Sequence, residues 1–128
     1  MEKVKFENEY IINASKGIIY NLLSTPSGLS EWFADDVNIN KDIYTFIWDD
    51  SEEEARLLTK KNEEHIKFRW MEDEEDGNDV FFEIRIKIVP LTGETVLIIT
   101  DFADEDELEE AALLWDSQID KLKRIMGS

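Results

Sequence analysis

Segments in which every second residue is large and apolar fill the middle of this chain. Between positions 65 and 71, Ile66, Phe68 and Trp70 alternate with charged or polar neighbours. A period of two is that of a β-strand with one buried face. The alternation predicts strands at 3–13, 36–40, 43–48, 54–60, 65–71, 80–88 and 94–102. The last strand is apolar on both faces, so we expect both of its sides to be covered.

Two short segments near the start follow helical spacing instead. Ser15 is suited to an N-cap, and apolar residues then recur at helical spacing as far as Leu23. Thr25 and Pro26 restart the chain, because threonine can cap a helix and proline fits its first turn. The sequence therefore predicts two short helices, the second ending near Phe33.

A long amphipathic helix is predicted from Glu105 to about Met126. Asp104 and Glu107 have the spacing of a capping box, and Gly127 stands where a C-cap belongs. Its apolar stripe consists of Leu108, Ala111, Ala112, Trp115, Ile119 and Leu122.

The order of elements is therefore β-α-α-β-β-β-β-β-β-α, within one domain that spans residues 1–128. Consecutive strands with short links favour an antiparallel sheet. A helix of about 22 residues spans about 33 Å, which is long enough to lie across a whole twisted sheet. We predict an α+β fold, in which a curved antiparallel sheet wraps around the long C-terminal helix.

Charge excludes several classes of partner. The 128 residues include 14 lysines and arginines against 31 aspartates and glutamates, a formal net charge of −17. Such a charge repels nucleic acid and anionic lipid.

Cysteine is absent, so disulfides, thiol nucleophiles and cysteine-ligated metals are excluded. Without a secretory h-region or an apolar run of about 18 residues, we expect no integral membrane segment and a cytoplasmic location.

Three segments carry a resemblance to a known family: Leu23–Phe33 with its Ser-Thr-Pro and Trp-Phe elements, Phe68-Arg-Trp70, and Leu114–Leu122. Together with the order of elements, they resemble the START-like, or SRPBCC, superfamily, and this resemblance implies the helix-grip fold. The resemblance covers essentially the whole chain. It is strongest to small bacterial START-like proteins related to the activator of the heat-shock-ninety ATPase.

The resemblance implies a cavity between the sheet and the long helix. Members of the superfamily use it for lipids, sterols, polyketides or plant hormones, some are cyclases or aromatases, and some bind a chaperone. No catalytic residue is shared across the superfamily, so the resemblance assigns none here. Trp32 and Phe33 would lie near the mouth of the cavity, and Trp115 on the covering helix.

Aromatic and aliphatic residues predicted to face the helix form the candidate ligand cavity. They are Trp32, Phe33, Phe46, Trp48, Phe68, Trp70, Phe82, Ile84, Ile98, Leu108, Ala111, Ala112, Trp115 and Ile119. The first hypothesis is a non-enzymatic domain that binds a small, slim, lipid-like hydrophobic molecule there, with no metal or cofactor. The alternative is a protein-interaction or co-chaperone-like module, whose filled core leaves an acidic surface to meet a basic partner. A third is a cyclase- or hydrolase-like enzyme acting on an apolar substrate.

The two acidic runs of the chain are interpreted as loops rather than as metal sites. Residues 72–83 approximate the ligand spacing of an EF-hand calcium loop, but the flanking segments are predicted strands rather than helices. We therefore expect a hairpin loop at 72–79, turning at Asp76 and Gly77. A second run at 49–54 is expected to be another solvated hairpin loop.

A few polar residues remain as weaker candidates. His65 is out of phase with its apolar neighbours, so we expect it to face solvent without a catalytic role. Arg69, Glu83 and Arg85 are expected on the outer face of adjacent strands, where they could form a cross-strand ion pair.

Two carboxylates are expected near the mouth of the cavity. Glu31 precedes Trp32, and Asp101 ends the last predicted strand. A carboxylate buried there would have a raised pKa and could act as an acid or a base.

Overall fold

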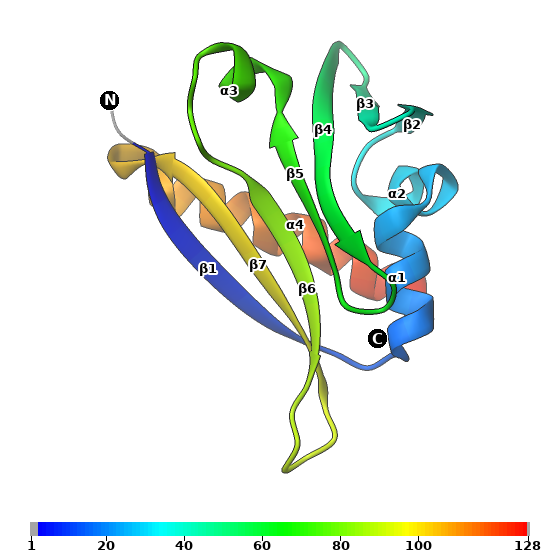
Figure 1. The fold of residues 1–128 in the computed structure, drawn as a ribbon. Helices are drawn as coiled ribbons and strands as arrows, with labels where there is room; N and C mark the ends of the chain where they lie inside the picture. Colours follow the sequence, from blue (N-terminus) through cyan, green and yellow to red (C-terminus); the bar gives the residue numbers. More distant parts are fainter. Residues whose placement is uncertain (1–2, 128) are drawn as a thin grey trace.

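The structure is a computed structural model that describes residues 3–127. Its order of elements is the predicted one, with one additional short helix (Figure 1). The strands are β1 (Lys3–Ile12), β2 (Asp36–Asn40), β3 (Ile43–Trp48), β4 (Ser51–Lys61), β5 (His65–Trp70), β6 (Phe82–Ile88) and β7 (Thr95–Asp104). The helices are α1 (Lys16–Ser24), α2 (Pro26–Trp32), α3 (Met71–Glu75) and α4 (Leu108–Met126).

The strands form one antiparallel sheet in the order β1-β7-β6-β5-β4-β3-β2. β1 therefore pairs with the last strand, and α1 and α2 carry the chain across to the far edge. Figure 1 shows the sheet curving around α4, which crosses behind it, with α1 and α2 at one side. This arrangement confirms the predicted α+β helix-grip fold.

The core lies between the sheet and α4. Trp115, Ile119 and Leu122 of α4 are buried, as the apolar stripe predicted. Alternate residues of the strands meet them because the pleat sends every second side chain to this face. The strand residues buried there include Phe46, Ala55, Ile66, Phe68, Phe82, Ile84, Leu97 and Ile99.

The two short helices begin at the predicted residues. The Ser15 hydroxyl accepts a hydrogen bond from Ile18 N at 3.4 Å, and the Thr25 hydroxyl accepts one from Gly28 N at 2.9 Å. Gly28 is where α2 meets α1 most closely, because a Cβ there would lie 2.4 Å from the carbonyl oxygen of Asn21. Pro26 takes the first position of α2, where its missing N–H costs nothing.

The predicted capping box at the start of α4 is wrong. Residues Glu105–Glu107 form a 3-10 turn, and neither Asp104 nor Glu107 makes a side-chain cap hydrogen bond. Carboxylate oxygens of Asp104 and Glu107 instead lie within 4.8 Å of each other. The predicted C-cap is present, with Gly127 at φ 71°, in the left-handed conformation that glycine tolerates best.

The two acidic runs also differ from expectation. The run at 72–79 contains the short helix α3 rather than a simple hairpin loop, and Asp73 is buried. Lys3 Nζ lies 3.0 Å from Asp73 Oδ1, which ties β1 to α3. In the run at 49–54, β4 already begins at Ser51, so its glutamates lie in a strand paired with β3 rather than in a loop.

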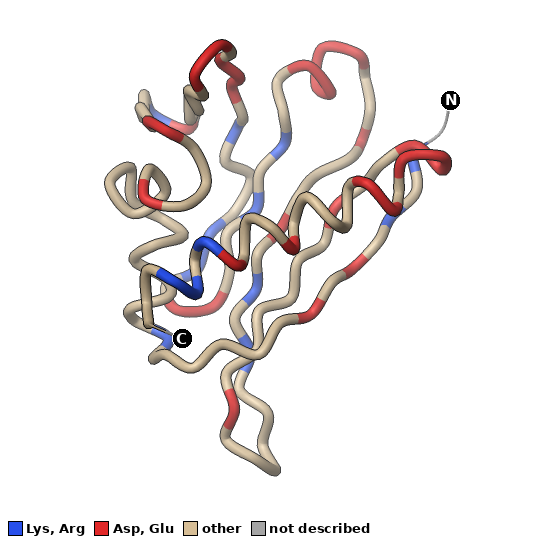
Figure 2. Tube along the Cα trace, turned by 180° about the vertical axis from the view of Figure 1, so that it is seen from behind, with Lys and Arg blue, Asp and Glu red and all other residues tan. Residues whose placement is uncertain are grey.

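Acidic residues gather at one end of the molecule. Figure 2 shows them at the start of β4, around α3 and at the beginning of α4. Lys121, Lys123 and Arg124 lie at the other end of α4, where they complement the helix dipole. No helix within residues 3–127 combines the length and the apolar character that crossing a membrane requires.

Candidate functional site

A pocket of about 340 Å³ opens between α4 and one end of the curved sheet. We call it the aromatic pocket. Four strands, β4 to β7, contribute to it, together with the end of β3, the residue after α2 and one face of α4. Its lining residues are Phe33, Trp48, Ser51, Glu53, Trp70, Phe82, Asp101, Leu114, Trp115 and Gln118.

The five aromatic side chains of the pocket form one connected group. Phe33 lies at its centre, with its ring centroid 6.0 Å from each of Trp48, Phe82 and Trp115. Trp70 contacts Phe82 with a centroid distance of 5.1 Å. Trp48 Nε1 donates to the carbonyl oxygen of Phe33 at 3.1 Å, which fixes its ring against α2. The aromatic wall is therefore rigidly packed, as suits a preformed site.

Asp101 is the polar group built into this wall. Its Oδ2 accepts a hydrogen bond from Trp115 Nε1 at 2.8 Å, and its Oδ1 accepts one from Phe102 N at 2.7 Å. Burial raises the pKa of the Asp101 carboxyl, although both hydrogen bonds act in the opposite direction. Asp101 therefore places a desolvated carboxyl against the aromatic rings.

Three further polar residues line the opening. Gln118 Oε1 is buried and has no hydrogen-bond partner within the described part of the chain, although an amide oxygen in such a place needs a donor. Glu53 is exposed, and its position opposite Phe46 in the β3–β4 ladder puts it on the sheet face that α4 covers. Ser51 begins β4 beside Trp48. Together with Asp101, these residues offer acceptors and negative charge beside an apolar wall.

Five of the predicted cavity residues line the aromatic pocket: Phe33, Trp48, Trp70, Phe82 and Trp115. Five others are packed in the core and do not reach this pocket: Trp32, Phe46, Phe68, Ile84 and Ile119. Large side chains at facing positions fill most of the space between sheet and helix, so the opening is confined to one end.

Ile98 was placed on the wrong face of its strand. Leu97 and Ile99 are buried toward α4, and Ile98 is half-buried on the opposite face, paired with Glu9 and Arg85. β7 is apolar on both faces, so alternation alone could not identify the inner one.

The small residues expected to leave room on α4 lie outside the aromatic pocket. Leu108, Ala111 and Ala112 are half-buried, and the Ala112 carbonyl accepts a hydrogen bond from Asn8 Nδ2 at 3.2 Å. Ala111 lines a wider, more open groove of about 610 Å³ between the start of α4 and the end of β7. The aromatic pocket therefore lies further toward the middle of α4 than these residues, at Leu114, Trp115 and Gln118.

The sequence named Asp101 and Glu31 as candidates for the mouth of the cavity. Asp101 lines the pocket, whereas Glu31 is exposed on α2 and does not line it. Ser51, Glu53, Leu114 and Gln118 were missed. The run at 49–54 was expected to be a solvated loop, and Leu114 and Gln118 lie outside the predicted apolar stripe of α4. The curvature of the sheet brings these residues together.

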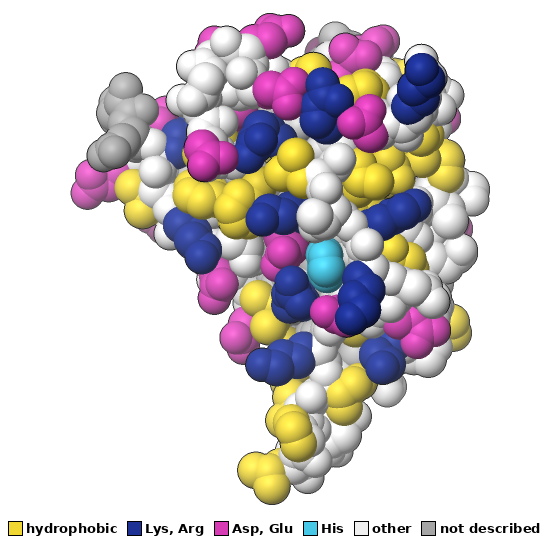
Figure 3. Space-filling model, viewed as in Figure 1, with side chains coloured by type: hydrophobic (Ala, Val, Ile, Leu, Met, Phe, Trp, Pro, Cys, Tyr) yellow, Lys and Arg dark blue, Asp and Glu magenta, His cyan; other side chains and the backbone are white. Residues whose placement is uncertain are grey.

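The outer face of the sheet carries the remaining predicted polar residues. His65 lies there as expected, but its side chain is only 15% exposed, and its Nε2 contacts Thr59 Oγ1 at 3.2 Å. Figure 3 shows it as the cyan side chain among lysines and arginines.

The expected cross-strand ion pair between Arg69 and Glu83 is wrong. Arg69 forms an ion pair with Asp79 at 2.8 Å, and Glu83 pairs with Arg85 of its own strand.

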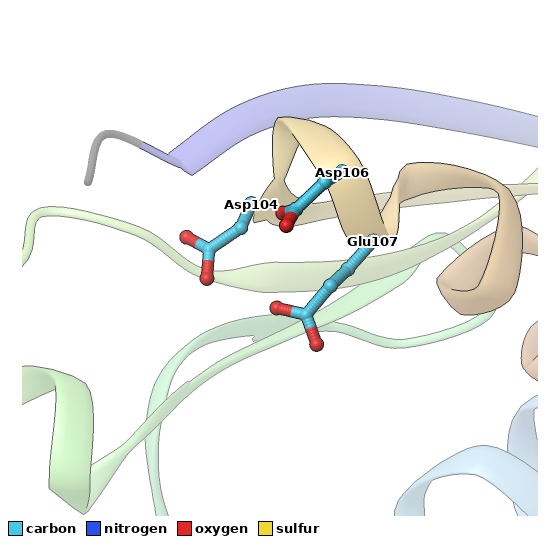
Figure 4. Close-up of side chains that lie close together, drawn as sticks. All are labelled: Asp104, Asp106 and Glu107. Carbon is cyan, nitrogen blue, oxygen red and sulfur yellow. The ribbon is translucent and has the colours of Figure 1, made fainter.

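A cluster of three carboxylates stands at the start of α4. Ligand atoms of Asp104, Asp106 and Glu107 all lie within 4.8 Å of one another (Figure 4). The hydrogen bond with Asp104 and the surrounding negative charge raise the pKa of Glu107. Asp106 and Glu107 are exposed, so the cluster is a solvated group of acids.

A curved antiparallel sheet around a long C-terminal helix, with a pocket between them, defines a helix-grip domain. The chain belongs to the START-like superfamily, whose domain model matches residues 1–128. Similar solved structures agree with this assignment and confirm the resemblance found in the sequence. A comparison with curated proteins found no match.

Three of these structures illustrate the range of the family. A Bacteroides fragilis protein solved by NMR is 40% identical, with a TM-score of 0.68 over 98% of this chain and 93% of that one. The Aha1 dimer of Colwellia psychrerythraea is 16% identical, with a TM-score of 0.79 over 94% and 93%. A putative protein of the dynemicin biosynthetic locus is 11% identical, with a TM-score of 0.78 over 97% of this chain and 47% of that one.

Proposed function

We propose that this domain binds a small, slim apolar molecule in the aromatic pocket, between α4 and the end of the sheet. The observation that carries the proposal is the opening of about 340 Å³ between α4 and the sheet, with five aromatic side chains in its lining. This volume falls at the lower end of the range of about 300–1,000 Å³ for small-molecule sites. A bulky polycyclic ligand would not fit without moving Trp48 or Trp115.

A neutral apolar dye such as Nile red tests the proposal. We expect saturable binding, seen as an increase in dye emission and as energy transfer from the pocket tryptophans. Ser51→Trp should fill the opening and abolish the signal. Ser27→Trp adds the same side chain at an exposed position of α2 outside the pocket, so it should not change the signal. Binding that survives Ser51→Trp, or a dye that never saturates, would contradict the proposal.

A protein-interaction module is the second candidate. Leu113 and Leu114 are 60% and 64% exposed on α4, next to Glu109 and Glu110. An exposed apolar pair flanked by acids is suited to a partner with a basic surface. We expect Leu113→Ser to abolish the binding of such a partner, and we expect binding to weaken as the salt concentration is raised. Binding that ignores both changes would count against this candidate.

A further inference from the structure

The charged side chains that line the aromatic pocket are all acidic. Two carboxylates, Asp101 and Glu53, line it, and within residues 3–127 no lysine, arginine or histidine does. Asp101 takes both of its hydrogen bonds from neutral N–H groups, the Trp115 indole and the Phe102 amide. The charge of Lys3 lowers the pKa of Asp101, but the Lys3 ammonium group pairs with Asp73 and does not line the pocket. A desolvated carboxyl that makes no ion pair among the described residues is costly, and that cost falls when a cation binds beside it.

Acidic residues continue outward from the pocket. Two further hollows adjoin it and share Glu53 and Trp70 with its lining. We call the acids that line them the acidic rim: Glu52, Glu53, Glu54, Glu72, Glu75 and Asp76. Lys3 is the one basic residue in the described lining of these hollows, and Asp73 pairs with it at 3.0 Å. The rim concentrates negative potential at the entrance, which attracts cations toward it.

Aromatic rings favour the same kind of ligand. Trp is the side chain whose ring attracts cations most strongly, and Trp48, Trp70 and Trp115 all line the pocket. Gln118 Oε1 adds a buried acceptor that no donor satisfies among the residues described. A ligand with N–H groups would satisfy this oxygen, whereas an acidic ligand would meet the like charge of Asp101 and Glu53.

We propose that the ligand of the aromatic pocket is an organic cation, a protonated amine on an apolar body. The apolar body lies against Phe33 and Phe82, and the ammonium group lies near Asp101, Gln118 and the tryptophan rings. This inference rests on the proposed function and narrows it from any apolar molecule to one chemical class. It also gives a role to the acidic rim, which the aromatic wall alone does not explain.

Three probes of equal chain length test the charge preference: octylammonium, octanol and octanoate, titrated separately and followed by tryptophan emission and calorimetry. We expect octylammonium to bind at least about tenfold more tightly than octanol, and octanoate to bind more weakly than either. Raising the NaCl concentration from about 20 to about 200 mM should weaken the binding of octylammonium and leave the binding of octanol nearly unchanged. Equal affinities for octylammonium and octanol would overturn this inference while leaving the proposed function standing. Failure of all three to bind would contradict the proposed function itself.

Matched variants locate the effect in the pocket. Glu53→Gln should reduce the preference for octylammonium over octanol several-fold, and Trp70→Leu should do the same by removing a ring. Glu9→Gln removes an equal charge from an exposed position on the outer face of the sheet, so it should not change the preference. Two outcomes would overturn the inference, because each would show only general attraction to an acidic protein. One is an equal effect of Glu53→Gln and Glu9→Gln on the preference. The other is binding of octylammonium that survives Ser51→Trp.

Discussion

The indole Nε1 of Trp115 donates a hydrogen bond to Asp101 Oδ2 at 2.8 Å, joining the middle of α4 to the end of β7. Trp115 is 7% exposed, and Phe33 and Phe82 pack against its ring. The pair is therefore both a structural link and one wall of the aromatic pocket. It fixes the distance between helix and sheet at the place where the pocket opens.

Removing the Trp115 side chain should destabilise the fold strongly. We expect Trp115→Ala to lower the free energy of unfolding by about 3 kcal/mol or more, as for other buried large aromatic residues. Trp115→Phe keeps a ring but leaves the Asp101 oxygen without its donor, which should cost about 1–3 kcal/mol. Urea unfolding followed by circular dichroism measures both. An unchanged midpoint for Trp115→Ala would show that this face of α4 is not buried.

Asp101 should give an unusual pH dependence. Its pKa is raised by burial above the ordinary value of 3.8, so the folded protein holds this proton more tightly than the unfolded chain does. Protonation of Asp101 therefore stabilises the fold as pH falls toward about 4, and this contribution is lost as pH rises through the raised pKa. The stability of the natural protein relative to Asp101→Asn should increase as pH is lowered from neutrality. A relative stability that falls over the same range would contradict the raised pKa.

Two glycines in the N-terminal helices should respond oppositely to alanine. At Gly28 a Cβ would lie 2.4 Å from Asn21 O and 2.7 Å from Leu22 Cα, so α1 and α2 must separate. We expect Gly28→Ala to cost about 1–3 kcal/mol, the range for overpacking. At Gly17 the nearest contact is the end of the Glu63 side chain at 3.4 Å, so Gly17→Ala should be neutral or stabilise α1 by up to about 1 kcal/mol. Thermal unfolding compares the two, and equal losses would argue against the close approach of α2 to α1.

Neighbouring isoleucines of β7 test which face of the strand meets α4. Ile99 is fully buried, whereas Ile98 is half-buried on the outer face. We expect Ile99→Ala to cost about 2–5 kcal/mol, as for other buried aliphatic residues, and Ile98→Ala to cost less than half as much. Chemical denaturation gives both values on the same scale. A larger loss for Ile98→Ala would mean that the strand is turned the other way.

Much of the architecture could be predicted because local patterns specify it. Alternation around Phe68 and Phe82 predicted strands, and the stripe through Trp115 and Ile119 predicted the buried face of α4. The predictions failed where local signals were ambiguous or competed. Ile98 sits in a strand that is apolar on both sides, and the Asp104 side chain makes no cap hydrogen bond to the helix. The helix α3 forms inside an acidic run whose Asp76-Gly77 step suggested only a turn.

The class of fold follows from local patterns, because hydrophobic period and helix caps act within a few residues of one another. The large negative charge and the number of aromatic residues are likewise properties of the amino-acid sequence. The position of the pocket depends on tertiary packing, since side chains from six different elements fill a curved space. Glu53 belongs to an acidic run and Gln118 lies outside the predicted apolar stripe, yet sheet curvature brings both to the aromatic wall beside Asp101.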